Sequence, residues 1–429
     1  MSADSAITLA VLGGSGVFTP ELIFALTGWI DGRPPLRVVL HGRDGAKLTH
    51  VAGACKRIAS GQQPLLRIEQ QTDLRRALEG ADYILNQVRV GGLRARAQDE
   101  TFPHALGLPG EETVGAGGFA NALRTIPVTQ GLAQAIRSAA PDAMVINLTN
   151  PASMVCQVLA RAGLARVIGV CDAPLSLLAT LARLLERPAE SLTYTYVGIN
   201  HVGWATGLSA NGVDVLPLAV ARMSHQEGGS VDPAVIEATE VIPNPYLRYL
   251  YHPDRMLAAQ RGQPARGAAV QAMEVGLLEE YSRPTAAGRP ELLARRGALW
   301  YTLAIVPLLA ATINNRLTVQ VVNVPNGTIL PWLPATTTVE VPCVVDGSGV
   351  RPLAVSLPQP DLQAILLGYA TYEALAIEAV EQQSRATALR ALLANPFIGA
   401  ADQALGILDA VWPDGFTRQL GDAAPPDGT

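Results

Sequence analysis

Residues 7–22 read ITLAVLGGSGVFTPEL, an apolar run followed by a glycine-rich turn. The run Ile7–Leu12 is rich in branched aliphatic residues and too short for a helix, which predicts a buried strand. The glycines after it let the main chain turn tightly and approach a pyrophosphate, whose charge is favoured by the free N–H groups at the start of the next helix. We therefore predict a dinucleotide-binding turn formed by Gly13, Gly14, Ser15, Gly16, Val17 and Phe18.

Two points about this turn stay open. The third position of the G-x-G-x-x-G motif is Thr19, so an ordinary strand-to-helix turn is an alternative interpretation. The segment Leu40–Asp44, which follows the second apolar run, has no clear acidic residue to hold the ribose hydroxyls of NAD. Arg43 would instead suit the 2′-phosphate of NADP, so the choice between the two cofactors is left open here.

Further short apolar runs alternate with helical patterns through the first 175 residues, at Leu36–Leu40, Tyr83–Val88, Ala143–Asn147 and Val167–Cys171. Near-continuous apolar strands separated by helices imply a parallel sheet that is covered on both faces. The pattern therefore predicts an α/β fold, with a doubly wound Rossmann-type domain over residues 1–175.

The pattern changes after Pro174. We predict a second, mixed α+β domain over residues 176–429, with a frayed tail at 421–429. Its expected elements are a helix at Leu175–Glu186, a strand at Leu192–Val197, longer helices up to Arg316, strands near Thr318–Val322 and Thr337–Val345, and a helical run from Leu362 to about Leu393.

The composition excludes several classes of protein. Of 429 residues, 49% are apolar and 16% are charged, which argues against a disordered chain and a coiled coil. Thirty-two basic residues against 37 acidic ones give a net charge of −5, so the chain has no basic footprint for nucleic acid. Its four cysteines lack C-x-x-C spacing, which argues against a disulfide scaffold. The first residues do not resemble a secretory signal, so we place the protein in the cytoplasm.

One uncharged stretch, Gly297–Asn315, approaches the length of about 20 residues that a membrane-spanning helix needs. It contains Pro307, ends in two asparagines and has no second such segment elsewhere in the chain. We therefore predict a buried helix and no membrane partner.

Two segments carry residues suited to a metal ion. Cys171 and Asp172 follow a predicted strand at the carboxyl edge of the sheet, where ligands bind in open α/β folds. His201 lies between glycines, after the alternating stretch. A cysteine in an apolar strand is commonly a small core residue, and a lone histidine is commonly structural. Together, however, Cys171 and His201 would hold a divalent metal with open positions for substrate or water.

Segments in order along most of the chain resemble glycoside hydrolase family 4. They are GGSGVFTPEL (13–22), RVGGLRARAQDE (89–100), GEETVGAGGFANALRTIPV (110–128), INLTNP (146–151), GVCDAP (169–174), GINHVGW (198–204), IPNPYLRYLY (242–251), PARGAAVQAMEVGLLEEY (264–281), RGALWY (296–301) and NVPNGTILPWLP (323–334).

The resemblance implies a fold similar to lactate and malate dehydrogenases, a bound NAD, a divalent manganese ion and redox-assisted cleavage of a glycosidic bond. In this chemistry the nicotinamide takes hydride from C3 of the sugar, a base removes the acidified C2 proton, the aglycone leaves, water adds, and the hydride returns. The metal polarises the C3 oxygen. A thiolate ligand by itself would suggest zinc or iron, so manganese rests on the resemblance.

The resemblance also assigns roles to single residues. Tyr246 matches the catalytic base, which needs nearby positive charge because the ordinary pKa of tyrosine is near 10, and Glu112 matches a residue that assists it. The planar fork of arginine suits a sugar phosphate, and the substrate is expected to contact Arg96, Asn150, Asn200 and Arg266. The plainer alternatives are a tyrosine packed on the core and arginines in ordinary salt bridges.

Two departures bear on the substrate. Glu111 stands where family members usually have glutamine, which would add a carboxylate to the site. Asp172 follows the metal cysteine, as in the members that act on α-glucosides, whereas the segments at 242–251 and 323–334 resemble the β-acting branch. We expect a 6-phospho-β-glucosidase with Asp172 as the general acid, the alternatives being a 6-phospho-α-glucosidase or a glycosidase of unphosphorylated substrates.

Two hypotheses from other functional classes also stay open. An NAD-dependent 2-hydroxy acid dehydrogenase would share the fold without the hydrolysis, and a cofactor-binding regulator would lack catalysis. The long apolar segments of the second domain favour a homodimer or homotetramer.

Overall fold

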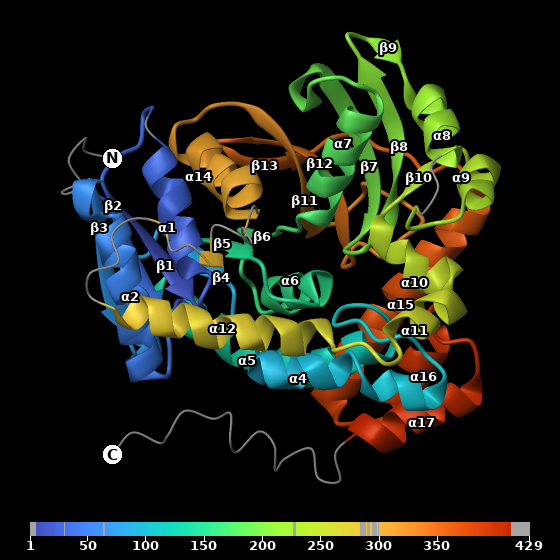
Figure 1. Ribbon diagram of the computed structural model, residues 1–429, viewed down its shortest axis with the longest axis horizontal. Coiled ribbons are helices and arrows are strands. Elements are labelled where there is room, and N and C mark those ends of the chain that lie inside the picture. Colours follow the sequence, from blue (N-terminus) through green and yellow to red (C-terminus); the bar gives the residue numbers. More distant parts are fainter. Residues whose placement is uncertain are drawn as a thin grey trace.

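Thirteen strands among the described residues form one sheet that runs through the whole molecule (Figure 1). The computed structural model describes residues 6–29, 31–62, 65–225, 229–283, 289, 292–293, 298 and 300–412. The order across the sheet is β10 (Ile242–Pro243), β8 (Val202–Ala210), β7 (Leu192–Ile199), β12 (Thr338–Asp346), β11 (Thr318–Pro325), β6 (Val167–Gly169), β5 (Met144–Asn147), β4 (Tyr83–Asn86), β1 (Ile7–Leu12), β2 (Leu36–His41) and β3 (Leu66–Gln71), with β13 (Gly349–Pro352) beside β12 and β9 (Val213–Asp214) beside β8.

The six strands from β6 to β3 are all parallel and follow the order 3-2-1-4-5-6 of a Rossmann fold. The predicted α/β class is confirmed, and β1 has the predicted bounds. The edge strand β3 was not predicted, because its sequence LRIEQQ is mostly polar and only Leu66 and Ile68 are buried. The strand order reverses at β1, which pairs with β2 on one side and with β4 on the other. In such folds this reversal leaves a crevice at the carboxyl ends of the two central strands, here β1 and β4.

Helices cover both faces of the parallel strands. In Figure 1, α12 (Arg266–Ser282) runs along one side of this half beside α4 and α2, and α4 also contacts α5. The helices of this half are α1 (Thr19–Gly28), α2 (Gly45–Ile58), α3 (Leu74–Leu78), α4 (Gly92–Asp99), α5 (Gly115–Ala139) and α6 (Ala152–Arg161), with short turns η1 (Ser60–Gln62) and η2 (Phe102–Leu106).

The remaining strands pair antiparallel, β11 pairs with β6 of the parallel half, and two pairings in this part of the sheet are a single residue pair long. One residue pair, Asn323 with Gly169, links β11 to β6, and one pair, Glu340 with Gly198, links β12 to β7. A Cβ atom at Gly169 would lie 2.8 Å from the Cβ of Asn323 and 2.8 Å from the Sγ of Cys156, so glycine is required at this junction. The mixed second part is confirmed, whereas the boundary at residue 175 stays a prediction.

The helices of the second part include α12, which crosses to the parallel half. They are α7 (Ala173–Leu184), α8 (Leu216–Ser224), α9 (Pro233–Thr239), α10 (Arg248–Tyr251), α11 (Pro253–Gln260), α12 (Arg266–Ser282), α14 (Val306–Ile313), α15 (Pro360–Gln382), α16 (Arg385–Ala394) and α17 (Ala401–Val411), with the short 3₁₀ turns η3 (Ala189–Ser191) and η4 (Pro245–Leu247) and the π-helix η5 (Tyr301–Ile305).

Two expectations for the second part differ from the structure. The run predicted as one helix up to Leu393 is two helices, because Gln383 adopts φ +53° and the side chain of Ser384 caps α16 by accepting the Thr387 N–H. The segment after β7 continues as a strand, β8, where helices were expected. Its glycines and small residues hide the strand pattern.

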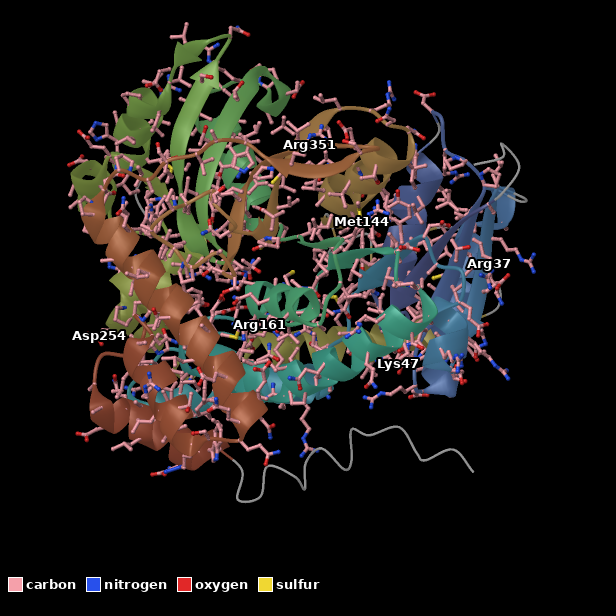
Figure 2. The ribbon with its side chains drawn as sticks, turned by 180° about the vertical axis from the view of Figure 1, so that it is seen from behind. Arg37, Lys47, Met144, Arg161, Asp254 and Arg351 are labelled. Atoms are coloured by element: carbon pink, nitrogen blue, oxygen red, sulfur yellow. The ribbon has the colours of Figure 1, made fainter. Side chains whose placement is uncertain are left out.

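Apolar side chains fill the space between the sheet and its helices. Met144 of β5 lies inside the body of the molecule, whereas Arg37 of β2 lies at the outer edge of the parallel half (Figure 2). The stretch from Tyr301 to Ile313 is helical and largely buried, as predicted. Among the described residues, no helix combines the length and the apolar character needed to cross a lipid bilayer. All four cysteines are buried and free, and the predicted frayed tail lies outside the described residues.

Candidate active site

One cleft at the carboxyl edge of the parallel strands gathers most of the residues that the sequence singled out. It is lined by Gly13, Ser15, Gly16, Val17, Phe18, Arg43, Arg96, Glu112, Asn150, Cys171, Asp172, His201, Tyr246 and Arg266. Two candidates do not line it. Gly14 packs against β2, where a Cβ atom would lie 2.9 Å from the backbone N of His41, and Asn200 is fully buried behind His201.

The glycine turn forms one end of the cleft. The Gly14 N–H donates to the His41 carbonyl at 2.7 Å, and the Gly16 N–H donates to the Gly13 carbonyl at 2.9 Å. Gly13 has φ +79°, and a Cβ atom there would lie 2.8 Å from the Gln87 carbonyl oxygen. Thr19 replaces the third glycine of the motif, and its hydroxyl accepts a hydrogen bond from Gln87 Nε2 at 2.9 Å. The departure from the motif therefore ties the turn to the segment that follows β4.

Cys171 and Asp172 lie between β6 and α7 at the middle of the cleft. The Ala173 N–H, at the start of α7, donates to the Cys171 Sγ at 3.4 Å. Burial, followed by the charges of Glu340 and Asp172, raises the pKa of the Cys171 thiol well above its ordinary value. The Asp172 residue precedes the first turn of α7 and is exposed to the cleft.

His201 occupies a two-residue hairpin turn between β7 and β8, where Ile199 pairs with Val202. Its backbone has φ +68°, a left-handed conformation that is uncommon outside glycine and concentrates at functional sites. The imidazole is buried, its Nδ1 has no hydrogen-bond partner among the described residues, and burial lowers the pKa of His201 to about 3. The ring is therefore neutral, the form that binds metal ions.

A buried polar cluster that sequence reasoning missed supports this turn. Glu340 of β12 accepts hydrogen bonds from Asn200 Nδ2 at 3.4 Å and from Asn323 Nδ2 at 2.8 Å. Burial raises the pKa of Glu340 to about 7. Glu340 lies within β12, whose sequence is mostly apolar. Side chains alternate between the two faces along a strand, and this alternation places the Glu340 side chain on a buried face.

Tyr246 stacks on His201, with ring centroids 3.7 Å apart and planes 8° apart. The turn η4 holds it there, because Asn244 accepts the Tyr246 N–H at 3.0 Å and donates its own side-chain amide to the Tyr196 hydroxyl at 2.8 Å. Burial, then the negative charges of Glu111, Cys171 and Asp172, raise the pKa of Tyr246. The Arg248 guanidinium lies 6.0 Å from its ring.

Glu112, which lines the cleft, lies between two arginines. It forms ion pairs with Arg89 and, at 3.1 Å, with Arg96. Burial alone would raise the pKa of Glu112, but these two cations outweigh burial and lower it, so the group stays ionised. Arg89 also lines the cleft, and the sequence alone does not identify it as a site residue.

Glu111 does not add a carboxylate to the cleft, contrary to expectation. Its side chain accepts the backbone N–H groups of Thr113 at 2.6 Å and Val114 at 2.8 Å, just before α5 begins. Burial and the neighbouring Glu112 raise the pKa of Glu111 to about 7.

A single carboxylate joins the two helices that carry the candidate substrate arginines. Glu100 accepts Arg96 Nε of α4 at 2.8 Å and the Gly267 N–H of α12 at 2.6 Å. A Cβ atom at Gly267 would lie 2.7 Å from the Ala97 backbone N, so glycine allows α12 to pack closely on α4. Arg266, the first residue of α12, thereby lies on the same cleft as Arg96.

The donor set fits a divalent ion held by few protein ligands. Cys171 and His201 both line the cleft, and the unpartnered, buried Nδ1 of His201 needs a partner. No group of three or more His, Cys, Asp or Glu side chains able to hold a metal occurs in the described part of the chain. An ion bound here would therefore take further ligands from substrate or water.

Comparison with known proteins gives matches over nearly the whole chain. Residues 8–187 match the model described as "Family 4 glycosyl hydrolase", and residues 196–398 match "Family 4 glycosyl hydrolase C-terminal domain". A "Probable 6-phospho-beta-glucosidase" of Bacillus subtilis is 31% identical over 419 residues, which cover 94% of this chain and 95% of that protein. "6-phospho-alpha-glucosidase 1" of Lacticaseibacillus paracasei is 27% identical over 439 residues, covering 96% and 99%.

Solved structures agree with these matches. The 6-phospho-beta glucosidase of Thermotoga maritima, solved with manganese, NAD⁺ and glucose-6-phosphate, has a TM-score of 0.86 and 26% identity over 94% of this chain and 97% of that one. A lactate dehydrogenase from Eimeria maxima has a TM-score of 0.56 and 14% identity over 89% of this chain and 97% of that one, which confirms the dehydrogenase-like fold. The predicted cofactors are those that the Thermotoga structure holds. Since the family models span most of the sequence and a 31% identical relative is matched almost end to end, this chain belongs to glycoside hydrolase family 4.

Proposed function

We propose that this chain hydrolyses 6-phospho-β-glucosides with NAD and a divalent manganese ion. The observation that carries the proposal is the meeting of three features in one cleft: the glycine turn, the Cys171 and His201 pair with Tyr246 stacked beside it, and the arginine pair at positions 96 and 266. The names of the relatives support phosphorylated glucosides as the substrate class.

Each end of the cleft has a separate task. When bound at Cys171 and His201 and along the glycine turn, the metal and NAD supply Lewis-acid polarisation and reversible hydride acceptance at C3 of the sugar. Arg96 and Arg266 bind the phosphate on O6 through charge-assisted hydrogen bonds, and Asn150 and Asn200 orient the sugar and the His201 turn.

Tyr246 Oη removes the proton from C2 of the sugar, and Glu112, held in ion pairs with Arg89 and Arg96, assists it. Burial raises the pKa of Tyr246, so the phenol stays protonated at neutral pH until positive charge enters the cleft. The base is thus active only in the loaded site, which protects bound sugar from proton loss without hydride transfer.

Asp172 is proposed to protonate the glycosidic oxygen as the aglycone leaves. Asp172 is exposed to the cleft at the N-terminus of α7, which suits a group that must contact the departing alcohol. The same residue favours the second candidate, a 6-phospho-α-glucosidase, because α-acting members have aspartate after the metal cysteine.

Paired 4-nitrophenyl α- and β-glucoside 6-phosphates test the proposal. With NAD and manganese present, we expect release of nitrophenol from the β anomer. Turnover of the α anomer alone would establish the second candidate, and net accumulation of NADH from a 2-hydroxy acid would replace both with a dehydrogenase. The cytoplasmic location and the homo-oligomeric state stay predictions.

A further inference from the structure

The far end of the cleft, beyond the glycine turn, carries an unusual set of charges. It is lined by His41, Gly42 and Arg43 after β2, and by Thr72, Asp73 and Arg75 after β3. In Rossmann folds the adenosine ribose of the dinucleotide lies at the end of the second strand. An acidic residue there accepts the 2′-hydroxyl of NAD, whereas an arginine accommodates the 2′-phosphate of NADP.

The first residue after β2 cannot supply the acidic group. Gly42 is buried, and a Cβ atom there would lie 2.7 Å from both the Cβ and the Oγ of Ser15 in the glycine turn. Any side chain at position 42 would therefore displace the turn that faces the dinucleotide.

The aspartates nearby are engaged by helix starts. Asp44 accepts the Lys47 N–H at 3.0 Å as the cap of α2, and Asp73 accepts the Arg76 N–H at 2.8 Å as the cap of α3. Such capping bonds satisfy amides that the helix leaves unpaired, and they hold each carboxylate toward its own helix. Lys47 is also engaged, in an ion pair with Glu274.

Arg43 and Arg75 differ from these groups. Both are exposed, and within the part of the chain that the structure describes neither guanidinium forms a hydrogen bond or an ion pair. Two uncompensated cations on the lining of a dinucleotide cleft favour an additional anion on the ligand.

We infer that Arg43, with Arg75 as a second contact, binds the 2′-phosphate of NADP, so that this chain binds NADP in preference to NAD. The inference rests on the proposed function in requiring that a dinucleotide occupies the cleft, and it replaces the NAD of that proposal with NADP. It makes Arg43 the specificity-determining residue of the cofactor site, since a guanidinium forms paired hydrogen bonds with a phosphate and gains little from a hydroxyl.

Isothermal titration calorimetry with NADP⁺ and NAD⁺, in the absence of substrate, tests the inference by binding alone. We expect the wild-type chain to bind NADP⁺ at least about tenfold more tightly, as charge-assisted hydrogen bonds allow. Arg43→Ala should weaken NADP⁺ binding about 10- to 100-fold and change NAD⁺ binding less than about threefold. Adenosine 2′,5′-bisphosphate and 5′-AMP should repeat the difference without the nicotinamide half.

Arg67→Ala is the matched control, because Arg67 is an exposed arginine on neighbouring β3 that does not line the cleft. It should leave both affinities unchanged. Equal or tighter binding of NAD⁺ by the wild-type chain would overturn the inference and leave the proposed function standing, as would an equal loss of both ligands in Arg43→Ala. Failure of both dinucleotides to bind would overturn the proposed function itself and the inference with it.

Discussion

The dinucleotide end of the cleft and its catalytic end are built in different ways. The first end is formed mainly by the main chain. Its glycines allow the tight turn, and its contacts are hydrogen bonds from amides to carbonyls, as between Gly14 and His41. At the second end, side chains from the turn between β7 and β8 and from β12 are buried with polar atoms left over, including His201 Nδ1, Asn200 Oδ1 and Glu340 Oε2. The hydrogen bonds of the glycine turn are complete in the protein alone, whereas the polar atoms left over at the catalytic end are satisfied by a ligand. Changes at the catalytic end should therefore alter chemistry and metal binding, and changes at the turn should alter folding.

Replacing the Tyr246 hydroxyl should give the largest effect. We expect Tyr246→Phe to lower kcat about 10³-fold or more, within the range for loss of a general base, while dinucleotide affinity measured by calorimetry stays the same. Exchange of the C2 proton of the substrate with deuterated water should also stop. Tyr249→Phe is the control, because that ring lies 6.4 Å from Tyr246 and does not line the cleft. Proton exchange that persists in Tyr246→Phe would contradict the role of base.

Removal of a metal ligand should come next. We expect Cys171→Ser and His201→Ala each to weaken Mn²⁺ binding about 100-fold, measured by electron paramagnetic resonance of the free ion. Cys343→Ser serves as the control, since Cys343 is also buried, in β12, but does not line the cleft. In the unaltered protein, Mn²⁺ should raise the unfolding temperature by mass action. Unchanged Mn²⁺ affinity in both ligand variants would place the ion elsewhere.

The contact between the two halves offers a test by pH. Glu373 of α15 is fully buried against α6, where it accepts the Ser153 hydroxyl and Gln157 Nε2, and burial raises its pKa to about 8. Because the folded state then holds a proton that the unfolded state releases, this group makes stability fall as pH rises from about 4.5 to about 8.

Glu373→Gln should remove about 1.4 kcal/mol per pH unit of that slope, measured by urea unfolding between pH 5 and pH 8. Glu381→Gln, an exposed change on the same helix, should keep the wild-type slope. Parallel slopes for wild type and Glu373→Gln would mean that this carboxyl is ionised in the folded protein.

Two glycines with similar backbone angles should separate conformational strain from close approach. Gly13 has φ +79° and no room for a Cβ atom, whereas Gly80 has φ +68° and no atom within 4 Å of the Cβ position. We expect Gly80→Ala to cost about 1 kcal/mol of unfolding free energy and Gly13→Ala at least about 1 kcal/mol more, with loss of dinucleotide binding only in the latter. Equal losses in the two variants would show that the turn adjusts around a methyl group.

The same contrast explains how much could be predicted from the sequence. The parallel strands and the glycine turn follow from short-range patterns, so β1 and the doubly wound order could be predicted. The polar cluster of Glu340, Asn323 and Asn200 could not, because its members come from two strands and a hairpin turn that are far apart in the sequence and meet only when the sheet is assembled. The resemblance pointed to single positions such as Tyr246, but only the fold brings that ring onto His201. Glu111 was misjudged because its sequence neighbour faces the cleft while Glu111 turns back to the main chain.

The carboxylate of Glu100, which touches both Arg96 and the first turn of α12, has a consequence for how an anion is received. Two neighbouring guanidinium groups repel each other, so an unrestrained pair would move apart in the absence of a bound anion. Glu100 binds Arg96 and the Gly267 N–H, so it fixes the start of α12, which carries Arg266, relative to Arg96. The binding site for a doubly charged phosphate is therefore formed before the ligand arrives, and little conformational entropy is lost on binding.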